Sequence, residues 1–422
     1  MIEWSDTDLM VRDAVRQFID KEIRPHLDEL ETGALSPYPI ARKLFSQFGL
    51  DVMAAESVKS MLERERAREA GEARDEKPDG ANDFSGSGQA SMMAVLVSEL
   101  ARVSIGLLST ASVSIGLGAA TIMSRGTLAQ KERWLPDLMT LKKIAAWAIT
   151  EPDSGSDAFG GMKTTVRRSG DPDGTYILNG QKTFITNGPC ADVLVVYAKL
   201  DSPVSGEPPT DRRNRPVLIF VLDAGMPGLT QGKPFKKMGM MSSPTGELFF
   251  DNVRLTPDRL LGENQRQADG DGRESARDNF AAERIGIAMM ALGIISECHR
   301  LCVDYAKTRT LWGKNIGQFQ LIQLKLAKME IARMNVQNMV FHTIERQQAG
   351  KPLTLAEASA IKLYSSEAAT DVAMEAVQLF GGNGYMAEYR VEQLARDAKS
   401  LMIYAGSNEV QVTHIAKGLL AD

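Results

Sequence analysis

Residues 175–187 read TYILNGQKTFITN, and this stretch decides the fold class. It is rich in β-branched and aromatic residues, with the turn signals DPDG before it and NG at its end. Comparable short runs lie around it, namely TTVRRSG, ADVLVVYAKLD, RPVLIFVLDA and ELFFDNVRL. The sequence therefore predicts an antiparallel β unit from about Trp147 to Leu261.

Helical periodicity precedes this β unit. Ser5 or Asp6 can cap a first helix that ends before Pro25. Two long apolar helices are expected over SMMAVLVSELARVS and SIGLLSTASVSIGLGAATIMSRG. The charged segment 57–88 lies between them and the start of the chain, and it reads as a polar helix that runs into a Gly/Ser/Pro-rich loop.

Helical periodicity also follows the β unit. The stretch from Arg273 to Thr310 is apolar on more than one face, which is typical of a buried helix. A second helix is stopped by Gly350, and a third begins at Thr354 with capping-box spacing and ends at Gly381-Gly382. The expected class is α+β with three domains: helical at 1–146, β at 147–262 and helical at 263–422.

The composition is that of an ordinary soluble globular protein, with 43% hydrophobic and 24% charged residues. A formal net charge of -5 argues against a nucleic-acid binder, which would show a basic excess. No apolar run of membrane-spanning length and no signal peptide stand out, so we expect no membrane span and a cytoplasmic location.

The chain has three cysteines, Cys190, Cys298 and Cys302, which are too few for a disulfide framework and fit a reducing compartment. With His299, the last two could suggest metal ligands, but no second ligand pair follows at zinc spacing. They lie four apart in a strongly apolar helix, which favours core positions. We therefore expect no metal site.

Two stretches in the β unit are suited to a polar ligand. TEPDSGSD, from Thr150 to Asp157, gathers hydroxyls, small residues and free backbone, as a phosphate or pyrophosphate needs, although an acidic surface turn has the same composition. In FITNG, Thr186 faces a cofactor or is simply a hydroxyl at a strand end.

Two stretches among the later helices are also candidates. RTLWGKNIGQFQ, from Arg309 to Gln320, offers a guanidinium suited to bidentate phosphate contact, or else a cation that caps a helix C-terminus. QLFGGNGY, from Gln378 to Tyr385, lacks the spacing and the preceding strand of a dinucleotide-binding fingerprint, and alone it reads as a helix C-cap.

The pair Glu283-Arg284 lies near the start of the most buried-looking helix. A carboxylate there should have a raised pKa and could act as a general base, but an ion pair or a helix N-terminal carboxylate would look the same. Near the C-terminus, the turn in IYAGSNE (403–409) offers free backbone N–H groups before a helix, yet it places Ala405 where a reactive side chain would be sought.

Six motifs occur together: WAITEPDSGSD, FITNG, KMGMMSSPTGELFFDNVRL, RTLWGKNIGQFQ, QLFGGNGY and YAGSNEVQ. Their order and intervals resemble the acyl-CoA dehydrogenase family over nearly the whole chain. The resemblance implies an N-terminal helical domain, a middle β-barrel domain and a C-terminal four-helix bundle. It also implies a homotetramer, a dimer of dimers, with FAD at subunit interfaces.

The resemblance assigns the site by position. Flavin contacts fall on the β unit and the C-terminal turn: Trp147, Ile149, Thr150, Ser156, Phe184 (tryptophan in many members), Ile185, Thr186, Ser407, Asn408 and Glu409. A further set of cofactor contacts, reaching the FAD of a neighbouring subunit, comprises Arg309, Trp312, Gln320, Gln378, Leu379, Gly381 and Gly382. The implied substrate contacts are Ser156, Arg284, Ala405 and Gly406.

The implied reaction is α,β-dehydrogenation of an acyl-CoA thioester to the trans-2-enoyl-CoA, as in fatty-acid β-oxidation or branched-chain amino acid catabolism. A carboxylate removes the α-proton, flavin N5 accepts the β-hydride, and an electron-transfer flavoprotein takes the electrons. The thioester carbonyl must be polarised as enolate charge develops.

Many members carry the catalytic glutamate where this chain has Ala405. A subset, including isovaleryl-CoA and some long-chain dehydrogenases, places it on the buried helix immediately before an arginine. Glu283-Arg284 matches this subset, so Glu283 is the expected base. Ala405 would contribute its backbone N–H, with a flavin ribityl hydroxyl, to the thioester carbonyl.

The chain departs from the family pattern in two places: segment 57–88 is inserted or divergent, and Met241 stands where an arginine is common. Two other function classes remain in view, a flavin-dependent monooxygenase on the same fold and a non-catalytic helical scaffold without FAD. Acyl chain length and branching do not follow from the sequence.

Overall fold

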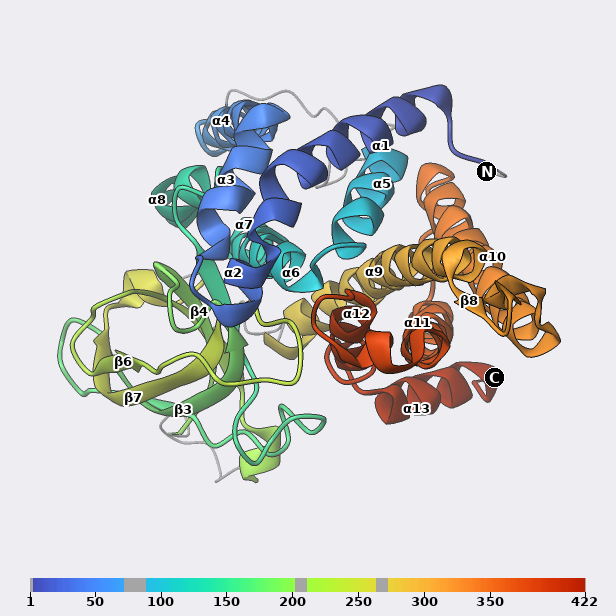
Figure 1. Ribbon diagram of the computed structural model, residues 1–422. Coiled ribbons are helices and arrows are strands. Elements are labelled where there is room, and N and C mark those ends of the chain that lie inside the picture. The colour runs from blue at the N-terminus through green and yellow to red at the C-terminus, as the bar shows by residue number, and fades with distance from the viewer. Residues whose placement is uncertain (1–2, 72–88, 202–210, 263–271, 422) are drawn as a thin grey trace.

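The computed structural model describes residues 3–71, 89–201, 211–262 and 272–421. Helices come first, a sheet follows and helices return, as the sequence predicts. The long helix α9 (Gly272–Thr308) runs across the molecule from beside the sheet toward α10 (Gln320–Gln348) (Figure 1). One hydrophobic core joins the N-terminal helices to this C-terminal group, with Phe18, Leu100 and Ile294 among its members.

The N-terminal part is helical throughout its described length. Of the two expected caps, Ser5 is used: its Oγ accepts from the Asp8 N–H at 3.2 Å, and its own N–H donates to the Asp8 carboxylate at 3.0 Å. The helices are α1 (Asp6–Phe18), α2 (Leu27–Thr32), α3 (Pro37–Gln47), α4 (Leu50–Glu69), α5 (Gln89–Ala101), α6 (Ile105–Val113), α7 (Ala120–Arg125) and α8 (Leu128–Met139).

The charged segment forms the polar helix that its sequence predicts. α4 buries Val58 and Leu62 and packs on α8. Its charged residues form ion pairs at that contact, Lys131 with Glu65 at 2.6 Å and Arg66 with Glu132 at 2.6 Å. The expected loop at 72–88 lies outside the described residues.

The sheet is mixed rather than purely antiparallel. β1 (Ala145–Ala148) and β2 (Thr165–Arg168) run parallel to β4 (Val193–Leu200), while β3 (Tyr176–Thr186), β5 (Val217–Asp223), β6 (Leu229–Gln231) and β7 (Thr245–Leu255) pair antiparallel. β1 and β2 reach β4 through long connections, as parallel pairing requires. The sequence pattern did not indicate β6, because three residues are too few for a period.

Five helices and a small hairpin make up the last part. They are α9, the pair β8 (Thr310–Leu311) and β9 (Lys314–Asn315), α10, α11 (Leu355–Phe380), α12 (Val391–Ser400) and α13 (Asn408–Leu419). The predicted capping box at Thr354 and Glu357 is present at the start of α11. α9, α10 and α11 pack on one another, and α12 and α13 pack on α11 (Figure 1).

Among the described residues, two helical stretches, Ile105–Arg125 and Ala282–Thr308, are long and apolar enough to cross a membrane by length and composition, contrary to the sequence-based expectation. In each, 67% of the apolar window is buried inside the protein, so both serve as core helices here. Cys298 and Cys302 on α9 are fully buried in the core, which confirms their interpretation as packing residues.

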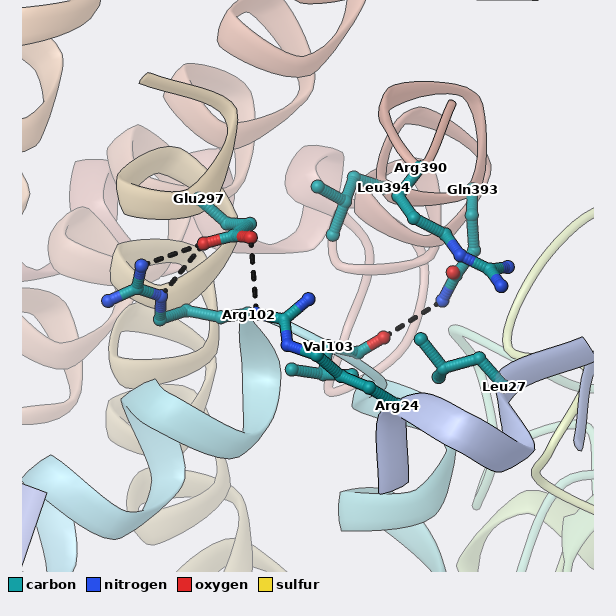
Figure 2. A pocket seen from close by; sticks show the side chains of 8 residues that line it. All are labelled: Arg24, Leu27, Arg102, Val103, Glu297, Arg390, Gln393 and Leu394. Carbon is teal, nitrogen blue, oxygen red and sulfur yellow. Dashed lines mark hydrogen bonds and ion pairs between the residues drawn. The ribbon is translucent and has the colours of Figure 1, made fainter. Parts of the chain in front are cut away.

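A cluster of charged side chains fixes α9 to the N-terminal helices (Figure 2). Glu297 on α9, 3% exposed, accepts from Arg102 at 2.7 Å and from Arg300 at 2.7 Å, and lies 3.5 Å from Arg24. Burial alone would raise its pKa, but the Arg300 and Arg102 guanidinium groups outweigh it and lower the pKa to about 2. Glu297 is therefore ionised and fully paired.

Candidate active site

The first turns of α9 lie against the sheet. The ring of Phe280 meets the indole of Trp147 on β1 edge-to-face at 6.0 Å, and Trp147 also donates to Thr121 at 3.2 Å. Glu283 follows Phe280 by one helical turn. The predicted base therefore lies at the interface between the sheet and the C-terminal helices.

The C-terminal turn comes to the same interface. A Cβ added to Gly406 would lie 3.8 Å from Arg284 Nη2, and Lys362 Nζ on α11 donates to the Gly406 carbonyl at 2.9 Å. Tyr404 places its hydroxyl 3.4 Å from Met290 Sδ, about two turns along α9 from Glu283. The fold thus brings Glu283-Arg284 beside the Ala405-Gly406 turn.

Glu283 has the electrostatics of a base. Burial raises the pKa of its carboxyl to about 7, against the charges of Arg284 and Lys362, which lower it. A carboxylate with a pKa near the working pH combines basicity with a usable ionised fraction.

Arg284 forms no ion pair with any residue that the structure describes. The residue is 3% exposed, and its Nε and Nη1 have no hydrogen-bond partner among the described residues. Burial lowers its pKa, and the charge of Glu283 opposes that shift. A buried guanidinium with open donors is suited to a polar ligand or ordered water.

The turn after Tyr404 is held in an unusual backbone conformation. Ala405 has φ 58° and Gly406 φ 79°, both in the left-handed region. Within the described part of the chain, neither of their N–H groups donates a hydrogen bond, while their carbonyls are bound by Gln411 and Lys362. Strain in a non-glycine residue together with free amide donors is typical of a ligand-binding turn.

The predicted flavin segments of the β unit lie beside each other. Lys182 on β3 donates to the Ile149 carbonyl at 2.9 Å and to Glu151 at 2.8 Å, and the Thr183 N–H donates to the Thr150 carbonyl at 2.9 Å. These bonds fix the 149–151 segment next to Phe184, Ile185 and Thr186.

The side chains of these segments differ in exposure. Phe184 has φ 58° and is 66% exposed, with its ring 5.8 Å from that of Phe235, so it presents an aromatic face to solvent. Ser156 is exposed, whereas Ile149 and Ile185 are buried. Thr150 and Thr186 are partly exposed. The two isoleucines are therefore placed to meet a ligand through the backbone, whereas Phe184, Ser156 and the two threonines can use their side chains.

The second set of predicted cofactor residues lies at the other end of α9. Asn383 donates to the Tyr305 hydroxyl at 2.9 Å, and Tyr305 stacks on Phe380 at 4.0 Å, so the Gly381–Tyr385 turn sits on the last turns of α9. Arg309, Trp312, Gln320, Gln378, Gly381 and Gly382 are exposed there, and Leu379 is buried.

One chain does not bring the two sets together. At 1.5 Å per residue, α9 rises about 33 Å between Glu283 and Tyr305. The set around Arg309 and the segments around Glu283 therefore lie toward opposite ends of α9.

Four polar residues that fix the backbone around this site were not predicted from the sequence. They are Lys182, Asn187, Lys362 and Gln411, each fully buried. Asn187 donates to the carbonyls of Thr110 and Ala145, both at 2.9 Å, and so ties α6 to β1. The available signal was a polar residue inside an apolar strand or helix.

Comparison with known proteins gives the family of the chain. Three family models match the chain: acyl-CoA dehydrogenase N-terminal domain at 52–142, middle domain at 146–253 and C-terminal domain at 270–420. The chain belongs to the acyl-CoA dehydrogenase family. The predicted helical, β and helical order of this family is confirmed, and the protein is an oxidoreductase.

Individual acyl-CoA dehydrogenases and related proteins are similar over most of their length. A short-chain specific acyl-CoA dehydrogenase from Megasphaera elsdenii is 39% identical over 82% of this chain and 85% of that protein. A caffeyl-CoA reductase–Etf complex subunit from Acetobacterium woodii is 32% identical over 99% of both chains.

Solved structures of the family superpose well. The butyryl-CoA dehydrogenase from Megasphaera elsdenii has a TM-score of 0.81 and 33% identity, with 100% of both chains covered. A glutaryl-CoA dehydrogenase from Mycobacterium smegmatis in complex with FADH2 has a TM-score of 0.81 and 26% identity, covering 99% of this chain and 96% of that one.

Proposed function

We propose that this protein is an FAD-dependent acyl-CoA dehydrogenase in which Glu283 removes the α-proton of the thioester. The single observation that carries this proposal is the position of Glu283: a carboxyl with a pKa raised to about 7 lies beside a turn in which the Ala405 and Gly406 N–H groups donate no hydrogen bond among the described residues. Base and oxyanion donor are the two protein groups that α-proton abstraction from a thioester requires.

Glu283 and Ala405 have separate tasks in this mechanism. A carboxylate oxygen of Glu283 takes the α-proton from the substrate. The backbone N–H of Ala405 donates to the thioester oxygen, where negative charge develops as the proton leaves. Ala405 carries only a methyl group, so no side chain at that position takes the place of the carboxylate that Glu283 brings from α9.

FAD fits the residues present. The exposed ring of Phe184 and the fixed segment from Ile149 to Glu151 would lie beside the isoalloxazine, and the positive N-terminal end of α13 at Ser407–Glu409 would lie near the diphosphate. FAD supplies the acceptor for the β-hydride when bound. The relative solved with FADH2 supports this assignment.

We also propose a homotetramer. The exposed set at the far end of α9, which includes Arg309, Trp312 and Gln320, would reach the FAD held by another subunit. An electron-transfer flavoprotein is the proposed electron acceptor, and a relative named as a subunit of a complex with Etf supports it. The substrate is an acyl-CoA, and a cytoplasmic location remains our expectation.

Anaerobic mixing of the FAD-loaded protein with a panel of straight-chain and branched acyl-CoA thioesters tests the proposal. Loss of the visible flavin absorbance and formation of the 2-enoyl-CoA are expected with at least one thioester. Glu283→Gln should keep FAD and reduce flavin roughly 10²- to 10⁴-fold more slowly. As a control, Glu297→Gln changes the same group on the same helix and should reduce flavin at the wild-type rate per bound FAD.

Two results would contradict the proposal. Near wild-type bleaching by Glu283→Gln would remove Glu283 as the base. Consumption of oxygen with hydroxylation of a substrate, and no response to any acyl-CoA, would point instead to a flavin-dependent monooxygenase.

A further inference from the structure

Lys362 is a fully buried lysine that the proposed mechanism leaves without a task. It lies on α11, and its Nζ donates to the Gly406 carbonyl at 2.9 Å and to Asn408 Oδ1 at 2.8 Å. Burying an ammonium group is costly unless its protons are bound, and these two acceptors bind it. Both acceptors belong to the turn that ends at α13, so the lysine is aimed at the turn.

A second side chain binds the same turn from α13. Gln411 Nε2 donates to the Ala405 carbonyl at 3.1 Å and to the Gly406 carbonyl at 2.7 Å. Ser366 on α11 also donates to Asn408 Oδ1, at 3.1 Å. The carbonyls of the turn are thus held by two independent elements, one through a cation and one through a neutral amide.

These anchors determine where the N–H groups of the turn point. A trans peptide directs the C=O of one residue and the N–H of the next to opposite sides, so the bonds to the Ala405 and Gly406 carbonyls turn the N–H groups of Gly406 and Ser407 away from α11 and α13. The Ala405 N–H belongs to the preceding peptide, and its direction relative to the held Ala405 carbonyl is set by the backbone angles of Ala405, whose φ is 58°. Ala405 in the left-handed region is strained, and such a conformation persists only when surrounding contacts impose it. Lys362 and Gln411 supply these contacts.

We propose that Lys362 is a positioning residue for the reaction, holding the Ala405-Gly406 turn so that the Ala405 N–H stays aligned with the thioester oxygen. This inference rests on the proposed dehydrogenase function. Lys362 touches the carbonyl of Gly406 and not the substrate, so it acts through the turn.

The charge of Lys362 also acts on the base. Lys362 is surrounded by Arg284 and Glu283 on α9, Glu367 on α11 and Glu409 on α13, and Glu283 faces Arg284, Lys362 and Tyr404. Lys362 lowers the pKa of Glu283 against the effect of burial. Removal of the ammonium should therefore raise that pKa, and the acid limb of the rate profile should move to higher pH.

The variant Lys362→Met tests whether Lys362 positions the turn or only fills space. It is compared with the wild type, both as FAD-loaded holoenzymes. We expect flavin reduction at saturating acyl-CoA to fall about ten- to a hundredfold, as a misplaced catalytic group does, with little change in KM. The acid limb should shift upward, and Lys362→Arg, which keeps charge and donors, should recover part of the rate.

Two further variants keep the test decisive. Gln411→Leu loosens the same turn without removing a charge, so it should slow flavin reduction and leave the acid limb in place; it carries the test if Lys362→Met does not retain FAD. Lys199→Met removes an equally buried lysine, which donates to the Gly160 carbonyl at 3.0 Å, and should lower stability without shifting the acid limb.

A Lys362→Met enzyme with wild-type rate and wild-type pH profile would overturn the inference, while leaving the dehydrogenase function intact. A slow Lys362→Met enzyme with an unshifted acid limb, matched by Lys199→Met, would reduce Lys362 to a structural residue. A wild-type flavoprotein that no acyl-CoA reduces would overturn the proposed function itself, and this inference with it.

Discussion

Two glutamates on α9 have different roles: Glu283 lies at the candidate site, and Glu297 lies at the contact with the N-terminal helices. Burial pushes both pKa values upward, yet the pKa of Glu297 falls to about 2 and that of Glu283 rises to about 7. Glu297 accepts hydrogen bonds from Arg102 and Arg300, whereas Glu283 feels Arg284 and Lys362 only through their charge. Hydrogen-bonded guanidinium groups therefore outweigh burial at Glu297, whereas Glu283 has no such bonds among the described residues and its pKa stays high.

Removal of the charge of Glu297 should have the largest effect. Glu297→Gln leaves the buried guanidinium of Arg102 without its carboxylate, and breaking such a pair costs about 3 kcal/mol. Equilibrium unfolding in urea near neutral pH should show this loss. A stability equal to wild type would mean that the cluster in Figure 2 contributes specificity of packing and no net stability.

Shortening the side chain of Glu283 should have the next largest effect. Glu283→Asp keeps a carboxylate but withdraws it by about one bond length, and a displacement of this size slows a positioned reaction by about a hundredfold. Stopped-flow flavin reduction under anaerobic conditions measures it. The rate of flavin reduction by Glu283→Gln gives the rate without a carboxylate at this position. A Glu283→Asp enzyme that is no faster would show that no rotamer of the aspartate reaches the α-carbon.

The two glutamates should give opposite pH dependences of stability. The lowered pKa of Glu297 contributes stability that is present above its unfolded value and is lost as the pH falls toward about 2. The raised pKa of Glu283 contributes stability that is present below its unfolded value and is lost as the pH rises through about 7.

Urea denaturation of the wild type, Glu283→Gln and Glu297→Gln at several pH values measures the direction in which stability changes with pH. Glu283→Gln should gain stability over wild type only above about pH 5, and the gain should be complete above about pH 7. The deficit of Glu297→Gln should shrink below about pH 4. Parallel curves for the two variants would contradict the contrast between the sites.

The smallest expected effect concerns the rim of the Glu297 cluster. Arg16 pairs with Glu99 at 2.8 Å, but the Arg16 side chain is 42% exposed. Arg16→Gln should therefore cost less than about 1 kcal/mol in urea unfolding, and less still in high salt. A loss as large as that of Glu297→Gln would show that the cluster behaves as one network.

The order of domains could be predicted because each part rests on a local signal: β-branched and aromatic runs between turns around residues 175–187, and apolar helices such as 273–310. The helix caps at Ser5 and Thr354 followed from their own side chains. The parallel pairing of β1 and β2 with β4 did not, because it depends on contacts between segments far apart in sequence.

The site divides in the same way. The resemblance led to Glu283, and the structure places it beside the Ala405-Gly406 turn, as that reading requires. Lys362 and Gln411 escaped prediction, because a lysine in an amphipathic helix pattern normally faces solvent, and only the fold reveals that this one faces a strained turn.

The separation of about 33 Å along α9 has a consequence for how the protein must be handled. If each FAD is bound by two subunits, then the fraction of FAD that stays bound depends on the protein concentration. Dilution alone should then release flavin, visible as rising fluorescence of the free cofactor, and excess FAD should draw subunits together. Assembly and cofactor loading would be one equilibrium, and a diluted assay would underestimate the enzyme in a crowded cell.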